Sequence, residues 1–321
     1  MKKILNKMSP SKKLLLTIIV SILVAIVVTL LAKVKILTSY HVGILITACI
    51  NIILVVSLNL TTGFLGQLTL GHAGFMAIGA YGCAYITKTF MEMGIISFPI
   101  GLLFGGILAA LSGVVIGVPA LRLRGDYLAI ITLAFGEVIR TILLNMSIVG
   151  GSMGYMGIPN YTSFAIAFLV CVACIIVVKF LIDSKHGRAI ISIAEDEIAA
   201  DASGINTTYF KILAFIVASF MAGIAGGLYA NQIGILMPGN FNFNKSINIL
   251  VMVVLGGMGS ITGSIISALV LTILPELLKG FADYWMLMYS AVLIIAMLLQ
   301  HAPFFKNIFA KVKAIFKKGD H

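Results

Sequence analysis

The sequence predicts an all-α fold: a polytopic membrane helix bundle with eight to ten membrane segments, some of them glycine-rich broken helices. Of the 321 residues, 60% are hydrophobic and only 10% are charged, and the mean hydropathy is +1.13. Uncharged windows of about 20 residues, the length that a helix needs to cross the hydrocarbon core, recur along the chain. Soluble proteins of this length do not have this composition, so we treat residues 1–321 as a single transmembrane domain.

Most basic residues flank the apolar segments, as they do in membrane proteins. The 22 Lys and Arg outnumber the 11 Asp and Glu, for a formal charge of +11. In a soluble protein this charge would suggest nucleic acid as a partner. Here clusters of lysine flank the first and the last apolar runs, which indicates cytoplasmic flanks against anionic membrane lipid and no nucleic-acid surface.

The first four apolar windows predict spans over residues 14–32, 42–60, 63–87 and 93–121. The third window contains six glycines, an unusual composition for a lipid-facing helix. The fourth carries a small residue at every fourth position: Gly101, Gly105, Ala109, Gly113 and Gly117. Because such a ridge lets another helix approach closely, we expect the fourth span inside the bundle.

The fifth span, residues 127–145, contains two charges. Glu137 and Arg140 are three residues apart and therefore neighbours on one helical face. Burying either charge alone is costly, so we expect an intramembrane ion pair, or two side chains that face a polar interior. A structural pair and a proton relay are the two alternatives. The uncharged residues 146–161, rich in Gly, Ser, Asn and Pro, predict an exposed loop before the sixth span at 162–182.

A polar segment, residues 183–208, predicts a cytoplasmic loop with a binding function. Apolar residues spaced three and four apart predict one amphipathic helix that ends at Gly204. Membrane-surface helices favour Lys and Arg on the polar face, whereas this one carries Glu195, Asp196, Glu197 and Asp201. Docking into a groove of another protein fits this acidic face better.

After a seventh span at 210–230, the uncharged window 246–275 is interrupted by the glycine-rich run 255–263. It predicts two short helices that enter and return or cross twice, with the glycines at the break. A last span at 284–300 returns the chain to its starting side. Non-helical backbone at membrane depth must be buried in protein or line water, so both glycine-rich segments belong near the bundle centre.

The loops also predict an orientation. With both termini on the same side, 16 of the 22 basic residues fall there, and the positive-inside rule makes that side cytoplasmic. Five fall on the opposite side, among them Lys88 and Lys245.

The residues predict no chemistry of the chain's own. There is no G-x-x-x-x-G-K-[ST] motif, so we expect ATP to be used by partner subunits. The five histidines are scattered without metal-ligand spacing, so we expect no metal and no bound cofactor. Glu137 is the sole acid well inside an expected span, which disfavours a proton-coupled carrier. No nucleophile or acid–base group indicates an enzyme.

Four segments resemble known transporters. The run Glu197-Ile-Ala-Ala-Asp-Ala-Ser-Gly204 resembles the EAA-type coupling loop of bacterial ABC importer permeases, although one residue separates its Glu from the Ala pair and the Leu-Pro ending is missing. Three more resemble the branched-chain amino-acid permease family: NLTTGFLGQLTLGHAGF at 59–75, LRLRGDYLAIITLAFGEVIR at 121–140 and GGSMGYMGIP at 150–159. The second and third look like the M-type permease of such importers.

The resemblance implies a heteromeric importer in a bacterial plasma membrane. Its other parts would be a second, H-type permease subunit, two cytoplasmic ATPase subunits and an extracytoplasmic solute-binding protein that delivers leucine, isoleucine or valine. The implied contacts with the ATPases are Glu195, Asp196, Glu197, Ala199, Ala200 and Gly204. An ABC permease for urea, a sugar or a nucleoside and a stand-alone secondary amino-acid carrier are the alternatives.

The first glycine-rich segment supplies candidate residues for the translocation pathway. They are the polar side chains within or beside the expected break: Thr61, Thr62, Gln67, Thr69 and His72. The alternative role for these side chains is to satisfy the backbone of a broken helix.

Overall fold

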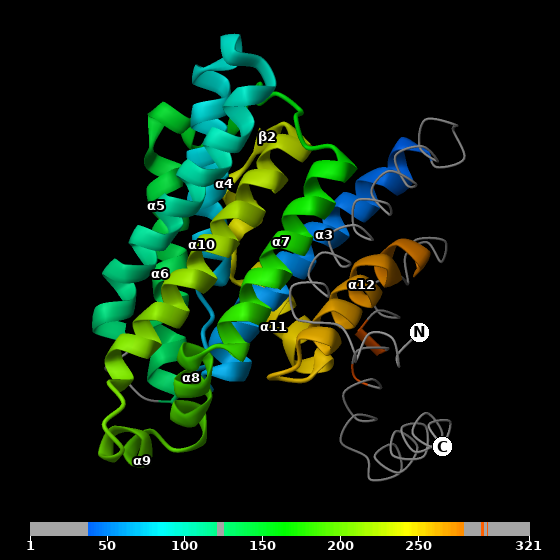
Figure 1. Cartoon of the computed structure of the whole chain (residues 1–321). Helices are drawn as coiled ribbons and strands as arrows, with labels where there is room; N and C mark the ends of the chain where they lie inside the picture. The colour runs from blue at the N-terminus through cyan, green and yellow to red at the C-terminus, as the bar shows by residue number, and fades with distance from the viewer. Residues whose placement is uncertain (1–37, 121–124, 279–289, 292–293, 295–321) are drawn as a thin grey trace, which may run out of the picture.

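The computed structural model describes residues 38–120, 125–278, 290–291 and 294, and this part of the chain is a bundle of helices (Figure 1). Six helical segments are long and apolar enough to cross a membrane, which confirms the all-α polytopic fold. They are Ser39–Phe64, Met91–Ala120, Asp126–Asn145, Phe164–Asp183, Thr207–Ile233 and Ile261–Leu278. The chain is thus a multi-pass membrane protein. The first expected span and nearly all of the last lie outside the described residues.

The elements follow one another with short connections. The first half contains α3 (Ser39–Asn59), the π-helical turn η1 (Leu60–Phe64), α4 (His72–Thr89), η2 (Met91–Ile96), α5 (Ser97–Ala120) and α6 (Asp126–Asn145). The second half contains η3 (Ser147–Val149), η4 (Gly151–Met153), β1 (Tyr155–Met156), α7 (Phe164–Asp183), α8 (Lys185–Glu195), α9 (Glu197–Ala202), α10 (Thr207–Ile233), β2 (Ile235–Leu236), η5 (Pro238–Phe241), α11 (Phe243–Gly256) and α12 (Ile261–Leu278).

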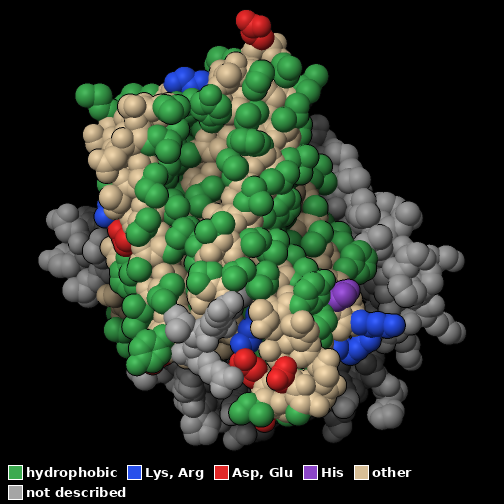
Figure 2. All heavy atoms as spheres, turned by 90° about the vertical axis from the view of Figure 1, so that its left-hand side faces the viewer, with side chains coloured by type: hydrophobic (Ala, Val, Ile, Leu, Met, Phe, Trp, Pro, Cys, Tyr) green, Lys and Arg blue, Asp and Glu red, His purple; other side chains and the backbone are tan. Residues whose placement is uncertain are grey.

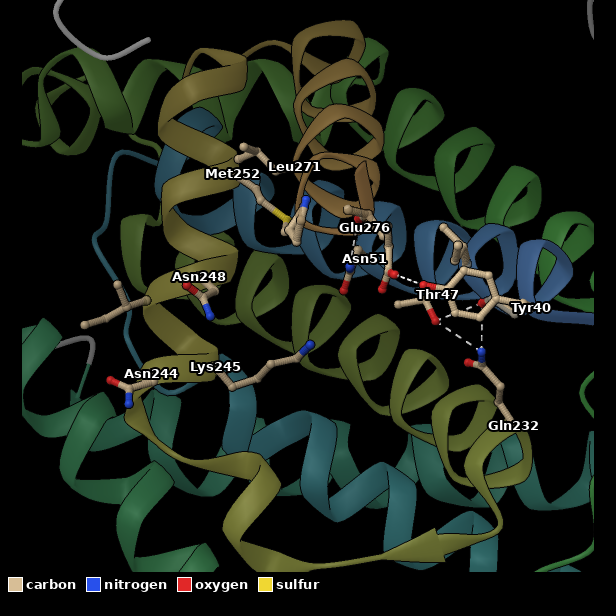
Figure 3. A pocket seen from close by; sticks show the side chains of 15 residues that line it. Tyr40, Thr47, Asn51, Gln232, Asn244, Lys245, Asn248, Met252, Leu271 and Glu276 are labelled. Atoms are coloured by element: carbon tan, nitrogen blue, oxygen red, sulfur yellow. Dashed lines mark hydrogen bonds between the residues drawn. The ribbon is translucent and has the colours of Figure 1, made fainter. Parts of the chain in front are cut away.

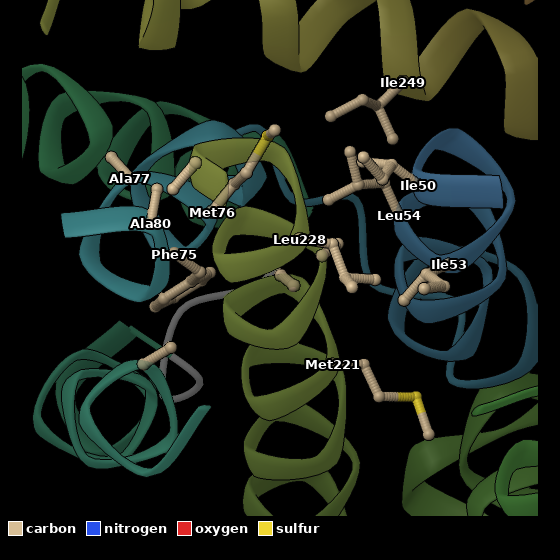
Figure 4. Packing of buried hydrophobic residues seen from close by; sticks show 14 of the residues in the cluster. Ile50, Ile53, Leu54, Phe75, Met76, Ala77, Ala80, Met221, Leu228 and Ile249 are labelled. Carbon is tan, nitrogen blue, oxygen red and sulfur yellow. The ribbon is translucent and has the colours of Figure 1, made fainter. Parts of the chain in front are cut away.

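Glycine lets α4, α5 and α10 pack with their backbones almost in contact. A Cβ on Gly79 would lie 2.2 Å from the Gly223 backbone, and one on Gly105 would lie 2.4 Å from the Gly79 carbonyl oxygen. The expected small-residue ridge of the fourth span is therefore confirmed, because Gly105 and Ala109 of α5 both meet Gly223 of α10. On the other side of α10, α3 adds a hydrophobic layer in which Ile53 and Leu54 approach Leu228 (Figure 4).

Two crossings are not continuous helices. As its glycine content predicted, the window at 63–87 is not one continuous helix. The chain passes through η1, runs without helix over residues 66–71 and becomes helical at His72. Gly66 has φ +72°, a conformation that other residues rarely adopt. We call residues 66–89 the first discontinuous crossing.

The second discontinuous crossing is residues 235–256. After β2 the chain returns into the bundle through η5 and becomes helical only at Phe243. As expected, the window 246–275 contains two helices, α11 and α12, separated by a break at Gly257 and Gly259, which both have positive φ. Lys245, which the loop count assigned to the side opposite the termini, instead lies in the first turn of α11. That assignment was wrong because the chain folds back into the bundle before Lys245.

The two ends of the bundle differ. The end of α7, helices α8 and α9 and the start of α10 lie together at the lower end in Figure 1, while β1 and β2 lie at the upper end. The expected loop at 146–161 contributes β1, which pairs antiparallel with β2. Lys88, near the end of α4, donates to the carbonyl oxygen of Met156 in β1 at 2.9 Å, so it lies at the end opposite α8 and α9.

Candidate functional site

The polar segment between α7 and α10 forms two helices, so the expectation of one amphipathic helix was wrong. Asp196 separates them with an extended backbone at φ −155° and ψ 107°. Its Oδ1 accepts hydrogen bonds from the backbone N–H groups of Ile198 (2.9 Å) and Ala199 (3.0 Å), which caps α9. Gly204 follows α9 with φ +83°, as its expected role in ending a helix requires.

One face of this segment is fixed to the bundle. Ala200, Ile190 and Ile193 are buried in a small hydrophobic cluster whose other members are Leu60 and Leu65 beside the first break and Ala214 of α10. The Glu197 carboxylate lies 2.7 Å from Nζ of Lys211, whose side chain is only 3% exposed. Two of the candidate ATPase contacts, Ala200 and Glu197, therefore make contacts within the chain.

The opposite face of the segment is open. Glu195, Asp196 and Ala199 are exposed, and Ile198 is 70% exposed. Figure 2 shows charged side chains gathered near the lower end of the molecule, below a face that is largely hydrophobic. The exposed face of α8–α9 thus combines one isoleucine with acidic side chains, whereas its other face is held by the bundle.

The five candidate pathway residues lie at or near the first break. Thr61, Thr62, Thr69 and His72 are buried, and Oγ of Ser57 lies 2.8 Å from Nε2 of His72. The Thr61 hydroxyl donates to the carbonyl oxygen of Leu58 at 3.0 Å. Gln67 lines a pocket of about 380 Å³ between this break and α9. Their role in a pathway stays a prediction.

Asn59 joins the two glycine-rich segments. The first lies inside the bundle as expected, but no residue of 255–263 is buried and Met258 is 61% exposed, so the expectation of a central position was wrong for the second, which forms the turn between α11 and α12. Its Oδ1 accepts from the backbone N–H of Gly259 at 2.9 Å, and its Nδ2 donates to the Ser260 carbonyl oxygen at 3.1 Å and to Oγ of Ser264 at 2.8 Å. Gly63 packs against Gly259 so closely that an added Cβ would lie 2.3 Å from its nitrogen. A movement of either segment must therefore disturb the other.

Glu137 and Arg140 of α6 form an ion pair of 2.7 Å, with both side chains about one third exposed. The other carboxylate oxygen of Glu137 accepts from the backbone N–H of Phe243 at 3.2 Å. Phe243 is the first residue of α11, where the helix dipole favours a negative charge. Glu137 thus helps to position α11 within the bundle.

A pocket with a volume of about 760 Å³ lies between α3, α10, α11 and α12 (Figure 3). We call it the polar pocket. Its polar lining comes from all four helices: Tyr40, Thr47, Asn51, Gln232, Asn244, Lys245, Asn248, Thr272 and Glu276. None of the five candidate pathway residues lines it.

Sequence reasoning missed the polar pocket, although a signal was present. Thr47 and Asn51 are four residues apart in an apolar span, and so are Asn244 and Asn248. That spacing places each pair on one helical face. Among the described residues, no group of three His, Cys, Asp or Glu side chains could hold a metal ion.

Comparison with known proteins gives one family. The model of the family described as branched-chain amino acid transport system / permease component matches residues 40–298. The high-affinity branched-chain amino acid transport system permease proteins LivM of Salmonella typhimurium and Escherichia coli are both 36% identical to this chain over 228 residues, which are 60% of this chain and 54% of each relative. LivH of Escherichia coli is 32% identical over 136 residues, 42% of this chain and 43% of LivH. The chain thus spans about half the length of the LivM relatives it matches. No solved structure matches it.

Proposed function

Because the family model covers residues 40–298, the chain belongs to the branched-chain amino acid permease family, and we propose that it is the M-type permease subunit of an ATP-binding-cassette importer for leucine, isoleucine and valine. The family is a transport family and not an enzyme family. The similarity to LivM proteins over 228 residues supports the substrate class and the subunit type.

The observation that carries the importer mechanism is the two-faced segment α8–α9. Its inner face is bound to α10 and to the first break, while Ile198 and the acids around it face outward. A partner that pushes on this surface would move both elements, because packed side chains transmit displacement. We propose that the partner is an ATPase subunit and that Glu195, Asp196, Ala199 and Gly204 take part in the contact.

The remaining partners follow from the same proposal. The second permease would be an H-type subunit, since LivH of Escherichia coli is also similar to this chain. A second ATPase and an extracytoplasmic solute-binding protein would complete the importer, with ATP consumed by the ATPases. The membrane would be a bacterial plasma membrane, and α8–α9 and both termini would be cytoplasmic, in keeping with the distribution of Lys and Arg.

Reconstitution tests this function. The chain would be purified with an H-type permease and two ATPases from the same organism and inserted into proteoliposomes with ATP inside. We expect uptake of radiolabelled leucine, isoleucine or valine that requires both ATP and the binding protein. Matched assays with urea, a sugar and a nucleoside are the controls for substrate class, and uptake of one of these instead would contradict the proposed substrate.

A stand-alone secondary carrier predicts a different result. Proteoliposomes that contain this chain without ATPases would then take up leucine in response to a proton or sodium gradient. We expect no such uptake, because the described spans carry few acidic groups that could couple to a proton.

A further inference from the structure

We infer that the polar pocket between α3, α10, α11 and α12 binds the transported amino acid and that the ammonium group of Lys245 holds its carboxylate. This assignment rests on the proposed function and adds a binding site to it. The volume of about 760 Å³ lies within the range of about 300–1,000 Å³ found for small-molecule sites.

Among the described residues, Lys245 is a cation without an acidic side chain in ion-pair range. Its side chain extends from the first turn of α11 into the polar pocket (Figure 3). The ion pairs of the described residues join Glu137 to Arg140 and Glu197 to Lys211, and no described Asp or Glu lies within 4.0 Å of Lys245 Nζ. An ammonium group among apolar helices is costly to keep without a partner, so an anion in the pocket would stabilise it.

The neighbouring amides suit the amino group of the same ligand. Nε2 of Gln232 donates to the Gly43 carbonyl oxygen at 3.0 Å and to Oγ1 of Thr47 at 3.1 Å. Its Oε1 is buried and has no hydrogen-bond partner in the described structure. Asn51 donates through Nδ2 to Oγ1 of Thr272 at 2.9 Å, which leaves its Oδ1 as an acceptor. A substrate ammonium group would supply donors for these oxygens.

The rest of the wall suits an aliphatic side chain. Ile44, Ile247, Met252 and Leu271 line the same pocket. The arrangement therefore offers a cation, amide acceptors and an apolar surface, which match the carboxylate, the ammonium group and the branched side chain of a zwitterionic amino acid. Urea, sugars and nucleosides have no carboxylate and would leave Lys245 unpaired.

Substitution of Lys245 tests the assignment in the reconstituted importer. We expect Lys245→Met to lower leucine uptake about tenfold to a hundredfold, the range that loss of one charged hydrogen bond produces. Lys245→Arg keeps the charge and should retain most of the uptake. Lys179→Met removes an exposed lysine of α7 outside the pocket and is the matched control.

A second variant tests the site without deleting the lysine. Asn248 lies one helical turn from Lys245, so Asn248→Asp would place a carboxylate beside the ammonium group and compete with that of the substrate. We expect uptake to fall about tenfold. Asn206→Asp is the matched control, because Asp can replace Asn in capping α10.

The outcomes separate the two proposals. Normalising uptake to ATPase activity stimulated by the binding protein corrects for any loss of assembly. Wild-type uptake by both Lys245→Met and Asn248→Asp, in an importer that does transport leucine, would overturn the binding site and leave the proposed function intact. A wild-type complex that takes up none of the three amino acids would overturn the proposed function and the site with it.

Discussion

The two discontinuous crossings have the same design but different surroundings. Each enters the bundle as non-helical chain and becomes helical beside α6: Gly71, just before α4, packs against Thr132, and Phe243, the first residue of α11, donates to Glu137. The two helix starts also contact each other, since the backbone N–H of Ala73 donates to Oγ of Ser246 at 3.1 Å.

The two crossings differ in what α4 and α11 pack against. Thirteen of the 18 residues of α4 are buried, and its glycines lie against α5, α6 and α10. Only Ser246, Ile249, Met252 and Val253 of the 14 residues of α11 are buried, and one side of α11 lines the polar pocket. One crossing is thus a packing element, whereas the other is a wall of a cavity. A broken helix in a membrane does not by itself mark the site of binding.

The largest effect should come from enlarging a glycine in the first crossing. Gly79→Leu forces a side chain into the Gly223 backbone, which a Cβ alone would approach to 2.2 Å. We expect a loss of about 3 kcal/mol or more in stability, measured as the thermal midpoint of the detergent-purified protein. Gly239→Ala, in the chain leading to α11, meets no atom within 4 Å and is the control. Equal thermal midpoints for both variants would contradict the conclusion that the first crossing is a packing element and the second is not.

Asn59→Leu should come next, because Asn59 links the two glycine-rich segments. The change removes three hydrogen bonds and leaves the N–H of Gly259 without its partner Oδ1. We expect about 2–3 kcal/mol of destabilisation and a loss of leucine uptake per folded complex. Asn59→Asp keeps the acceptor for Gly259, so its stability and its leucine uptake should lie between those of Asn59→Leu and wild type. Normal uptake in Asn59→Leu would show that the segments move independently.

A matched pair of alanine substitutions should separate stability from transport. Ser57→Ala leaves Nε2 of the buried His72 without its partner at 2.8 Å, and we expect a loss of about 1–2 kcal/mol in stability with normal uptake per folded complex. Asn248→Ala, in the pocket, should reduce uptake and change stability by less than about 0.5 kcal/mol. The reverse result, with transport sensitive to Ser57 and insensitive to Asn248, would exchange the roles of the two crossings.

The smallest effect should follow Glu137→Gln. The substitution weakens a partly exposed ion pair with Arg140 and removes the negative charge at the start of α11. Together these contribute about 1 kcal/mol, and the leucine concentration for half-maximal uptake should rise, because Lys245 is two residues from Phe243. Glu92→Gln, at an exposed position of η2, is the control. An unchanged half-maximal concentration would mean that Glu137 does not position α11.

Much of the fold could be predicted from the sequence, because hydrophobic window length and glycine content report directly on membrane segments. The break before α12 was expected from its glycines. The break at Asp196 was not, because the spacing of apolar residues continues through it. Only the capping bonds from Ile198 and Ala199 make two helices more favourable than one.

The candidate site was harder to predict. Lys245 resembles a loop lysine in sequence, since its position inside the bundle depends on how the chain returns from β2. The sequence placed Glu197 and Ala200 in the predicted coupling loop, but which face of that loop meets the bundle depends on the ion pair with Lys211 and on Leu60, which is distant in the sequence.

The partly buried contact between Glu197 and Lys211 also bears on how the proposed importer can be handled. At molar ionic strength the screening length falls to about 3 Å, which weakens attraction between exposed charges much more than attraction within a partly buried pair. If ATPase subunits bind the exposed acids of α8–α9 as proposed, a high-salt wash should release them while α9 stays attached to α10. The stripped chain would keep the proposed docking surface in place, and lowering the salt again would allow the ATPases to rebind without refolding of the loop.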